Sequence, residues 1–86
     1  MPTLSSFFGI VVSMYWNDHQ PPHFHACYAE NEVVIRLETL EVAAGSLPRR
    51  AMGLLLEWAG EHRAELRENW KRVHSQQPIL PIAPLE

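Results

Sequence analysis

The chain has 86 residues, of which 47% are hydrophobic and 20% are charged, and its formal net charge is −3. This mixture is typical of a globular protein and excludes a disordered chain, and a chain of this length makes one small domain. The apolar runs are too short to span a bilayer, so no membrane partner is expected. Nucleic-acid-binding domains usually carry an excess of basic residues, which neutralise phosphates. The negative net charge of this chain therefore does not support RNA as a partner.

The cellular compartment is predicted from two features of the sequence. The first residues lack the basic region and small-residue cleavage site that are typical of a signal peptide. Cys27 is the single cysteine, so the chain has no disulfide framework and fits a reducing environment. We expect a cytoplasmic protein.

The first predicted strand covers residues 7–16, which are rich in β-branched and aromatic side chains. These residues alternate between two faces, as they do along a strand. Gly9 lies inside the segment and would mark a bulge or a close approach of another backbone. Turn-forming residues at 17–22, including two consecutive prolines, end the strand.

The next segments predict a hairpin and a short extra strand. Residues 23–29 are expected to form the second strand and residues 32–37 the third, with the hairpin tip at residues 30–31. Residues 39–42 have the composition of a short fourth strand. The first half of the chain therefore predicts a small antiparallel sheet of three to four strands.

One long helix is predicted for residues 48–73. Ser46 is a suitable capping residue, and Pro48 suits the first turn of a helix. At about 100° per residue, one stripe of the helix gathers mainly apolar side chains, enough to cover one face of the sheet: Ala51, Leu54, Leu55, Trp58, His62, Leu66, Asn69 and Val73. The expected fold class is α+β, with this C-terminal helix packed across one face of the sheet.

The domain is predicted to occupy residues 1–76, followed by an extended Pro-rich apolar tail at residues 77–86. Prolines at every third position prevent a helix there. Such a tail suits a groove of this chain or of a neighbour. At this size a homodimer, or a partner at an exposed sheet edge, is also expected.

The densest group of chemically reactive side chains lies between Asp18 and Tyr28. Three of the five histidines and the only cysteine fall within nine residues, at His19, His23, His25 and Cys27. In a strand, His23, His25 and Cys27 share one face, and neighbours two apart are separated by roughly 6.6 Å. A metal ion would therefore use His25 with one neighbour and further ligands from Asp18, His19 or His62. Nitrogen-rich ligation favours zinc or a similar transition metal.

Three readings of this cluster stay open. His23 and His25 are candidate metal ligands, with zinc or another transition metal as the cofactor. Alternatively, Asp18, His19, His23 and His25 form a catalytic site in which histidine serves as an acid or base, for example in RNA cleavage. In the third reading, the histidines only hydrogen-bond the loop to the sheet. No enzyme class is assigned, because no familiar catalytic motif is present.

A partner-binding surface is expected on the helix. Arg49 and Arg50 form a local basic pair, and Trp70 lies at the edge of the apolar stripe, where an aromatic side chain suits an interface. These three residues are the candidates for contact with another protein.

Two segments together resemble a known family. The first is Asp18-His19, Pro21 to Ala26 and Tyr28; the second comprises Leu47 to Ala51, Glu57 to Ala59, His62-Arg63, Glu65-Leu66 and Asn69-Trp70. With Pro2-Thr3 and Phe7 to Ile10, they are similar to the small bacterial family called domain of unknown function 4160, over roughly residues 1–72. The chain departs from the family where Ser6 and Ser13 replace frequent basic residues, and Cys27 occupies a variable position.

The resemblance implies a function beyond what the residues themselves indicate. Members are commonly encoded beside another small protein, which suggests a two-gene toxin–antitoxin-like module. The chain would then be a toxin-like component that acts through a small protein partner encoded nearby and on RNA, with the histidine cluster as its site. A transition-metal-binding protein and a non-enzymatic interaction module are the alternatives.

Overall fold

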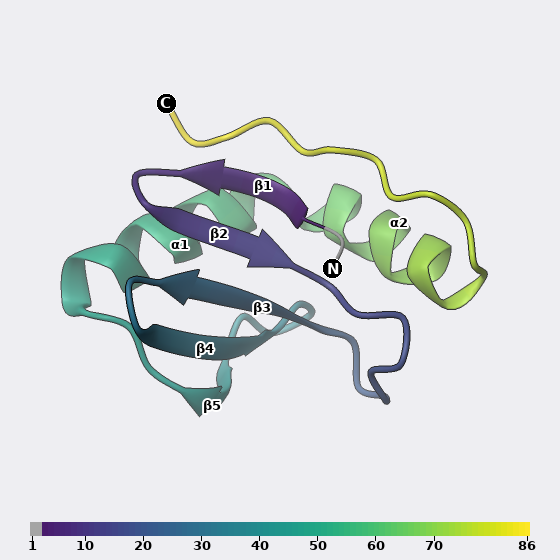
Figure 1. Ribbon diagram of the computed structural model, residues 1–86, viewed down its shortest axis with the longest axis horizontal. Helices are drawn as coiled ribbons and strands as arrows, with labels where there is room; N and C mark the ends of the chain where they lie inside the picture. The colour runs from purple at the N-terminus through teal and green to yellow at the C-terminus, as the bar shows by residue number, and fades with distance from the viewer. Residues whose placement is uncertain (1–2) are drawn as a thin grey trace.

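The computed structural model describes residues 3–86, which form a five-stranded sheet and two helices (Figure 1). The elements are β1 (Thr3–Phe7), β2 (Ile10–Ser13), β3 (His23–Tyr28), β4 (Asn31–Arg36), β5 (Val42–Gly45), α1 (Arg49–Glu61) and α2 (Arg63–His74). The strands follow one another in the order β1-β2-β3-β4-β5, and all neighbours are antiparallel. Neither helix in this described range is long and apolar enough to cross a membrane.

The α+β class is confirmed, but the expected three to four strands are too few. Residues 7–16 do not form one strand, because the chain reverses at Phe8 and Gly9, so that Phe7 pairs with Ile10. Both turn residues have positive φ angles, 49° and 82°, the backbone that a two-residue hairpin turn requires and that glycine adopts without strain. Gly9 therefore makes a hairpin rather than a bulge.

The last two strands also differ from the prediction. The β3–β4 turn lies at residues 29–30, because Tyr28 pairs with Asn31. Residues 37–39 form a turn, residues 40–41 lead out of it, and β5 begins at Val42. Gly45 ends β5 with a φ of 74°, and a Cβ atom there would lie 2.2 Å from the Glu32 carbonyl oxygen, so only glycine fits.

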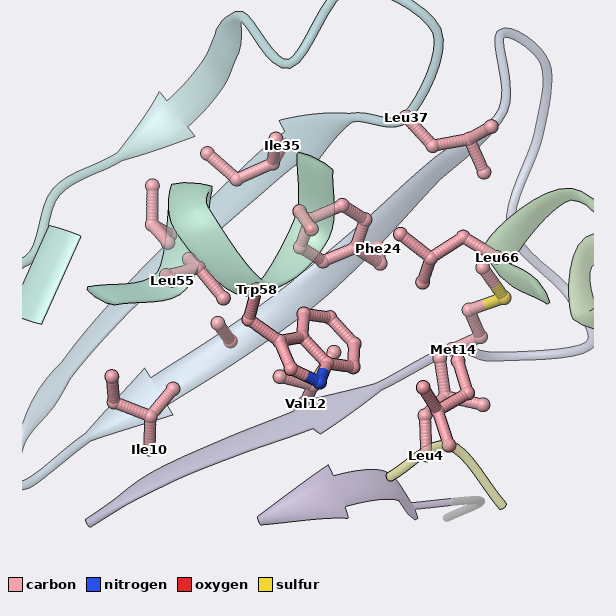
Figure 2. Packing of buried hydrophobic residues seen from close by; sticks show 14 of the residues in the cluster. Leu4, Ile10, Val12, Met14, Phe24, Ile35, Leu37, Leu55, Trp58 and Leu66 are labelled. Atoms are coloured by element: carbon pink, nitrogen blue, oxygen red, sulfur yellow. The ribbon is translucent and has the colours of Figure 1, made fainter. Parts of the chain in front are cut away.

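The core lies between one face of the sheet and the two helices. Alternate residues of β2, β3 and β4 point into it, and Trp58 of α1 is fully buried at its centre (Figure 2). Its ring lies 5.3 Å from the ring of Phe7 and 6.3 Å from that of Phe24, measured between centroids. The opposite face of the sheet carries His23, His25 and Cys27, none of which belongs to this core.

The single predicted helix is divided in two at His62, whose φ of −122° and ψ of 27° interrupt the helical backbone. The apolar stripe continues across the break, since Leu66, Trp70 and Val73 of α2 are all buried. Ser46 does not cap the helix; Pro48 occupies the N-cap position and makes no side-chain capping bond. The break lets α2 take a new direction along the sheet (Figure 1).

Residues 77–86 are extended and lie along β1 and α2 of the same chain (Figure 1). The backbone N–H of Ile82 donates to the Leu4 carbonyl oxygen at 2.9 Å, and the Ile82 side chain is buried. Trp58 Nε1 donates to the Ala83 carbonyl oxygen at 2.8 Å. Asn69 makes two bonds to the Leu80 backbone, at 2.8 and 2.7 Å. The tail therefore covers the β1 edge of the sheet.

Candidate metal centre

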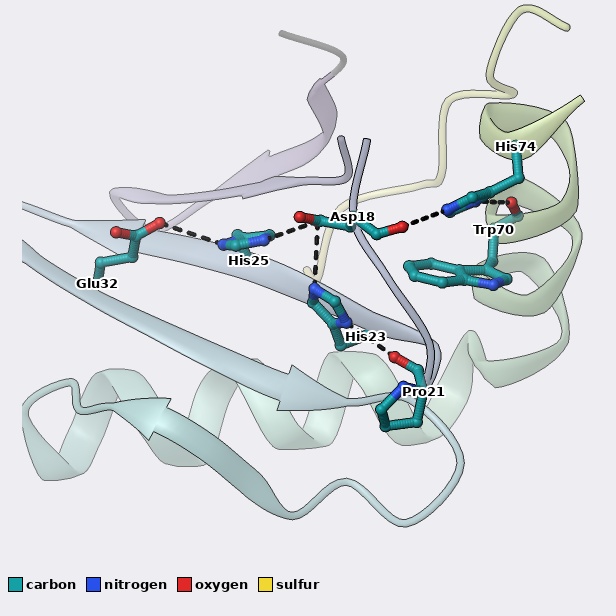
Figure 3. Close-up of polar contacts among 7 residues, drawn as sticks. All are labelled: Asp18, Pro21, His23, His25, Glu32, Trp70 and His74. Atoms are coloured by element: carbon teal, nitrogen blue, oxygen red, sulfur yellow. Dashed lines mark hydrogen bonds and ion pairs between the residues drawn. The ribbon is translucent and has the colours of Figure 1, made fainter. Parts of the chain in front are cut away.

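Two elements bring the candidate site together on the open face of the sheet. The alternation of β3 points His23 and His25 to this face, while Phe24 and Ala26 are buried on the other. The loop between β2 and β3 folds back over the start of β3 and places Asp18 above the two histidines (Figure 3). All three side chains are half-buried, at 16 to 20% exposure.

The three side chains converge on a small volume. Oδ2 of Asp18 lies 2.9 Å from Nε2 of His25 and 3.2 Å from Nε2 of His23. One potential ligand atom from each residue fits within a cluster whose members are at most 4.8 Å apart. Of the predicted candidates, the structure therefore unites Asp18, His23 and His25.

The second nitrogen of each imidazole is also engaged. Nδ1 of His23 lies 2.8 Å from the carbonyl oxygen of Pro21, and Nδ1 of His25 lies 3.3 Å from Oε2 of Glu32 (Figure 3). A carbonyl or carboxylate oxygen only accepts, so in the tautomer that satisfies both of these contacts each Nδ1 carries the hydrogen. In a neutral imidazole, each Nε2 then holds a lone pair and no hydrogen.

This arrangement leaves three acceptor atoms facing one another. The two Nε2 lone pairs point toward the Asp18 carboxylate, which also has only lone pairs when ionised. A single proton on Asp18 would serve only one of the two contacts. With the hydrogens on both Nδ1 atoms, a cation at the centre or a second proton on each imidazole satisfies both contacts of Asp18.

His74 fixes the loop that carries Asp18. Its Nε2 lies 2.7 Å from the Asp18 carbonyl oxygen, and its Nδ1 lies 2.9 Å from the Trp70 carbonyl oxygen (Figure 3). Its ring also packs on the ring of Trp70, with 4.1 Å between centroids. Since both acceptors are carbonyl oxygens, the imidazolium satisfies both contacts and the neutral ring only one. The C-terminal turn of α2 thereby holds the backbone of Asp18 in place.

The pKa of Tyr15 is raised by its position beside the cluster. Burial raises the pKa of its phenol, and the negative charges of Glu32, Cys27 and Asp18 raise it further. Its ring packs edge-on against that of His25, with 4.6 Å between centroids. The negative charges around the two histidines thus favour a cation between them.

The other predicted site residues lie elsewhere. His19 is exposed, and within residues 3–86 its side chain makes no hydrogen bond or ion pair. His62 pairs with Glu65 on the helices. Arg49 and Arg50 are exposed at the start of α1. Trp70 is only 6% exposed, and its ring packs against that of His23, with 5.3 Å between centroids.

Two contributors were not predicted from the sequence. Glu32 belongs to β4 opposite Cys27, which places it diagonally across from His25 on the same face. If the pairing of β3 with β4 had been known, it would have identified Glu32 as a neighbour of His25. His74 lies 56 residues from Asp18, and no sequence signal links the two.

One family model matches most of the chain. Residues 9–71 match the family model described as Domain of unknown function (DUF4160). The chain belongs to this family. The matched segment of this DUF4160 protein contains Asp18, His23 and His25, and it ends before His74. Searches of curated proteins and of solved structures return no match.

Proposed function

We propose that this DUF4160 protein binds a divalent transition metal ion through Oδ2 of Asp18 and the Nε2 atoms of His23 and His25. The observation that carries the proposal is the hydrogen bonding of the two Nδ1 atoms, which leaves three lone-pair atoms facing one another. A metal ion supplies the positive charge that neutral imidazoles lack. Metal-bound histidines commonly donate their other N–H to a carbonyl or a carboxylate, as both do here.

The ligand spacing supports the proposal. In a tetrahedral site, metal–ligand bonds of about 2.0–2.2 Å place neighbouring ligand atoms about 3.3–3.6 Å apart. The two contacts of Asp18 Oδ2, at 2.9 and 3.2 Å, are a few tenths of an ångström shorter, so a small outward movement of Asp18 would admit an ion. Two imidazoles and one carboxylate suit zinc, iron or a similar ion better than magnesium or calcium.

Three protein ligands leave coordination positions for water or a substrate. A bound ion of this kind can polarise an oxygen atom or lower the pKa of a bound water. In this proposal, Asp18, His23 and His25 act as ligands and not as acids or bases, and His19 has no part in holding the ion.

The competing state has a proton on each imidazole in place of the metal. Two imidazolium rings would then lie 5.3 Å apart between centroids, balanced by Asp18 and Glu32. The two states respond to pH in opposite directions. Protons compete with a metal for the histidines, so metal binding weakens as the pH falls, whereas the doubly protonated state is favoured.

The test is the metal content of protein purified without a histidine tag, measured by elemental mass spectrometry. We expect about one transition metal ion per chain in the wild type, and loss of that ion in His23→Ala/His25→Ala. His19→Ala is the matched control, since it removes a neighbouring histidine from outside the cluster and should retain the metal.

A second readout uses metal-free protein. Zinc at about 100 times its Kd should raise the free energy of unfolding by roughly 2.7 kcal/mol in the wild type and in His19→Ala, and leave the double variant unchanged. A wild type that carries no metal at neutral pH and shows no stabilisation by zinc, manganese or iron(II) would overturn the proposal.

A toxin-like role in a two-gene module is a second proposal, which one structural feature favours. β5 is the last strand of the sheet and all four of its residues are exposed, whereas the tail covers the β1 edge. An exposed edge can accept a strand from a partner. The test is growth arrest on expression, relieved by the product of the adjacent gene. Harmless overexpression without capture of that product would contradict this role.

A further inference from the structure

A cavity of about 350 Å³, lined in part by the proposed metal ligands Asp18 and His23, opens between the β2–β3 loop and the open face of the sheet. We propose that it is a subsite for a small oxyanion, a phosphate or carboxylate group, that binds the metal with one oxygen and Arg36 with the others. This inference rests on the proposed metal site and names the class of ligand that the site accepts.

The walls of the cavity combine the metal site with one cation. Asp18 and His23 line one side, Arg36 lines another, and Val34 and Ala43 contribute apolar surface. His23 and Arg36 are direct cross-strand partners of β3 and β4, so their side chains leave the same face of the sheet next to each other. A cavity of this size accommodates a small ligand.

Arg36 has no competing partner in the described part of the chain. Its side chain is exposed and makes no hydrogen bond or ion pair there. In contrast, Arg67 and Arg72 are held by Glu38 and Glu68. A planar guanidinium binds the two oxygens of a carboxylate or phosphate side by side, so Arg36 is available for this contact.

The charge at the cavity also favours an anion. A divalent ion bound by the single carboxylate of Asp18 leaves a net charge of about +1 at the metal, and Arg36 adds another positive charge. Glu32, which contacts Nδ1 of His25, carries a negative charge that lowers the total to about +1, and this total still favours an anion. His19 borders the same cavity, and its imidazole N–H can donate to an anion. An anion that reaches both the metal and Arg36 would neutralise this charge.

The experiment is calorimetric titration of zinc-loaded protein, at one zinc per chain, with inorganic phosphate and separately with oxalate. We expect at least one of these anions to bind the wild type. Arg36→Met should weaken that binding at least tenfold and leave zinc affinity unchanged. Arg49→Met, which removes the same charge from the start of α1, should bind the anion as the wild type does. Binding of phosphate alone or oxalate alone identifies the preferred group.

The outcomes separate this inference from the proposed metal site. Zinc that binds without any subsequent anion binding, or anion binding that Arg36→Met does not weaken, would overturn the subsite and leave the metal site standing. Failure of zinc, manganese and iron(II) to bind the metal-free protein would overturn both.

Discussion

The arrangement of hydrogens on a few side chains decides the chemistry of this site. His23 and His25 each use Nδ1 for a hydrogen bond that fixes the ring, and each directs Nε2 at the same oxygen of Asp18. The rings are therefore oriented before any ion arrives. Such preorganisation reduces the ordering that a bound ion would otherwise have to impose.

His74 provides a test of this preorganisation. We expect His74→Ala to lower zinc affinity about 10-fold to 100-fold, the range found when groups that orient metal ligands are removed. The physical reason is that Asp18 loses the contact that fixes its backbone carbonyl, while its carboxylate stays intact. Competition with a chelating dye would measure the affinity.

His62→Ala is the control for this prediction. It makes the same change in a histidine between the two helices, where the side chain pairs with Glu65. It should leave zinc affinity unchanged even if it lowers thermal stability. Equal zinc affinities in the wild type and in His74→Ala would show that the loop holds Asp18 without His74.

At the scale of elements, helix α2 connects to the sheet at two exposed points. His74 binds the β2–β3 loop, and Arg67 makes a bidentate contact with Glu38 in the turn between β4 and β5, at 2.9 to 3.0 Å. The first contact fixes the loop that carries Asp18, and the second fixes the turn that follows β4.

The contact of Arg67 predicts a dependence on pH. The hydrogen bond and charge of Arg67 hold the pKa of Glu38 below its usual value. A lowered pKa in the folded state contributes stability above the pKa of the unfolded chain, and this contribution is lost as the pH falls through the folded pKa. Both side chains are about half exposed, so the effect on stability is small.

An NMR titration that follows the carboxyl carbon of Glu38 measures its pKa directly. Arg67→Ala should raise the pKa of Glu38 toward its usual value, because the donor is lost. Arg49→Ala, which removes an arginine that does not contact Glu38, should leave this pKa unchanged. An unaltered pKa in Arg67→Ala would show that the ion pair does not persist in solution.

At the scale of the whole molecule, the C-terminal tail completes the fold. It contributes Ile82 to the core and gives backbone partners to Leu4, Trp58 and Asn69. A domain of this size has little apolar surface to bury, so a single tail residue matters for stability. The tail also lies along the β1 edge and bonds to it at Leu4, whereas β5 is the exposed edge available for pairing.

Two substitutions in the tail test this role. Ile82→Ala should lower the free energy of unfolding by about 2–4 kcal/mol, because it leaves a cavity in the core. Leu80→Ala should change it by only about 0.5 kcal/mol, since that side chain is 47% exposed and its backbone bonds to Asn69 remain. Urea unfolding followed by tryptophan fluorescence measures both. Equal effects would mean that the tail does not pack on the core in solution.

The sequence alone determined the features that depend on local periodicity. Alternation in the segment after the two prolines put His23 and His25 on one face, and the helical stripe identified Trp58, Leu66 and Val73 as buried positions. Membership of the DUF4160 family also followed from the residues, and the match to residues 9–71 confirms it. The strand alternation and the helical stripe depend only on neighbours within a few residues, where backbone geometry alone relates side chains.

Only the tertiary structure decided the features that depend on contacts across the chain. The turn at Gly9 and the break at His62 arise because the strands and helices must follow one another over a shared core, which local propensity does not encode. Likewise, the sequence left His19 and Asp18 as equal candidates. The return of the β2–β3 loop over β3, held by His74 from the far end of α2, brings Asp18 to the histidines and leaves His19 exposed.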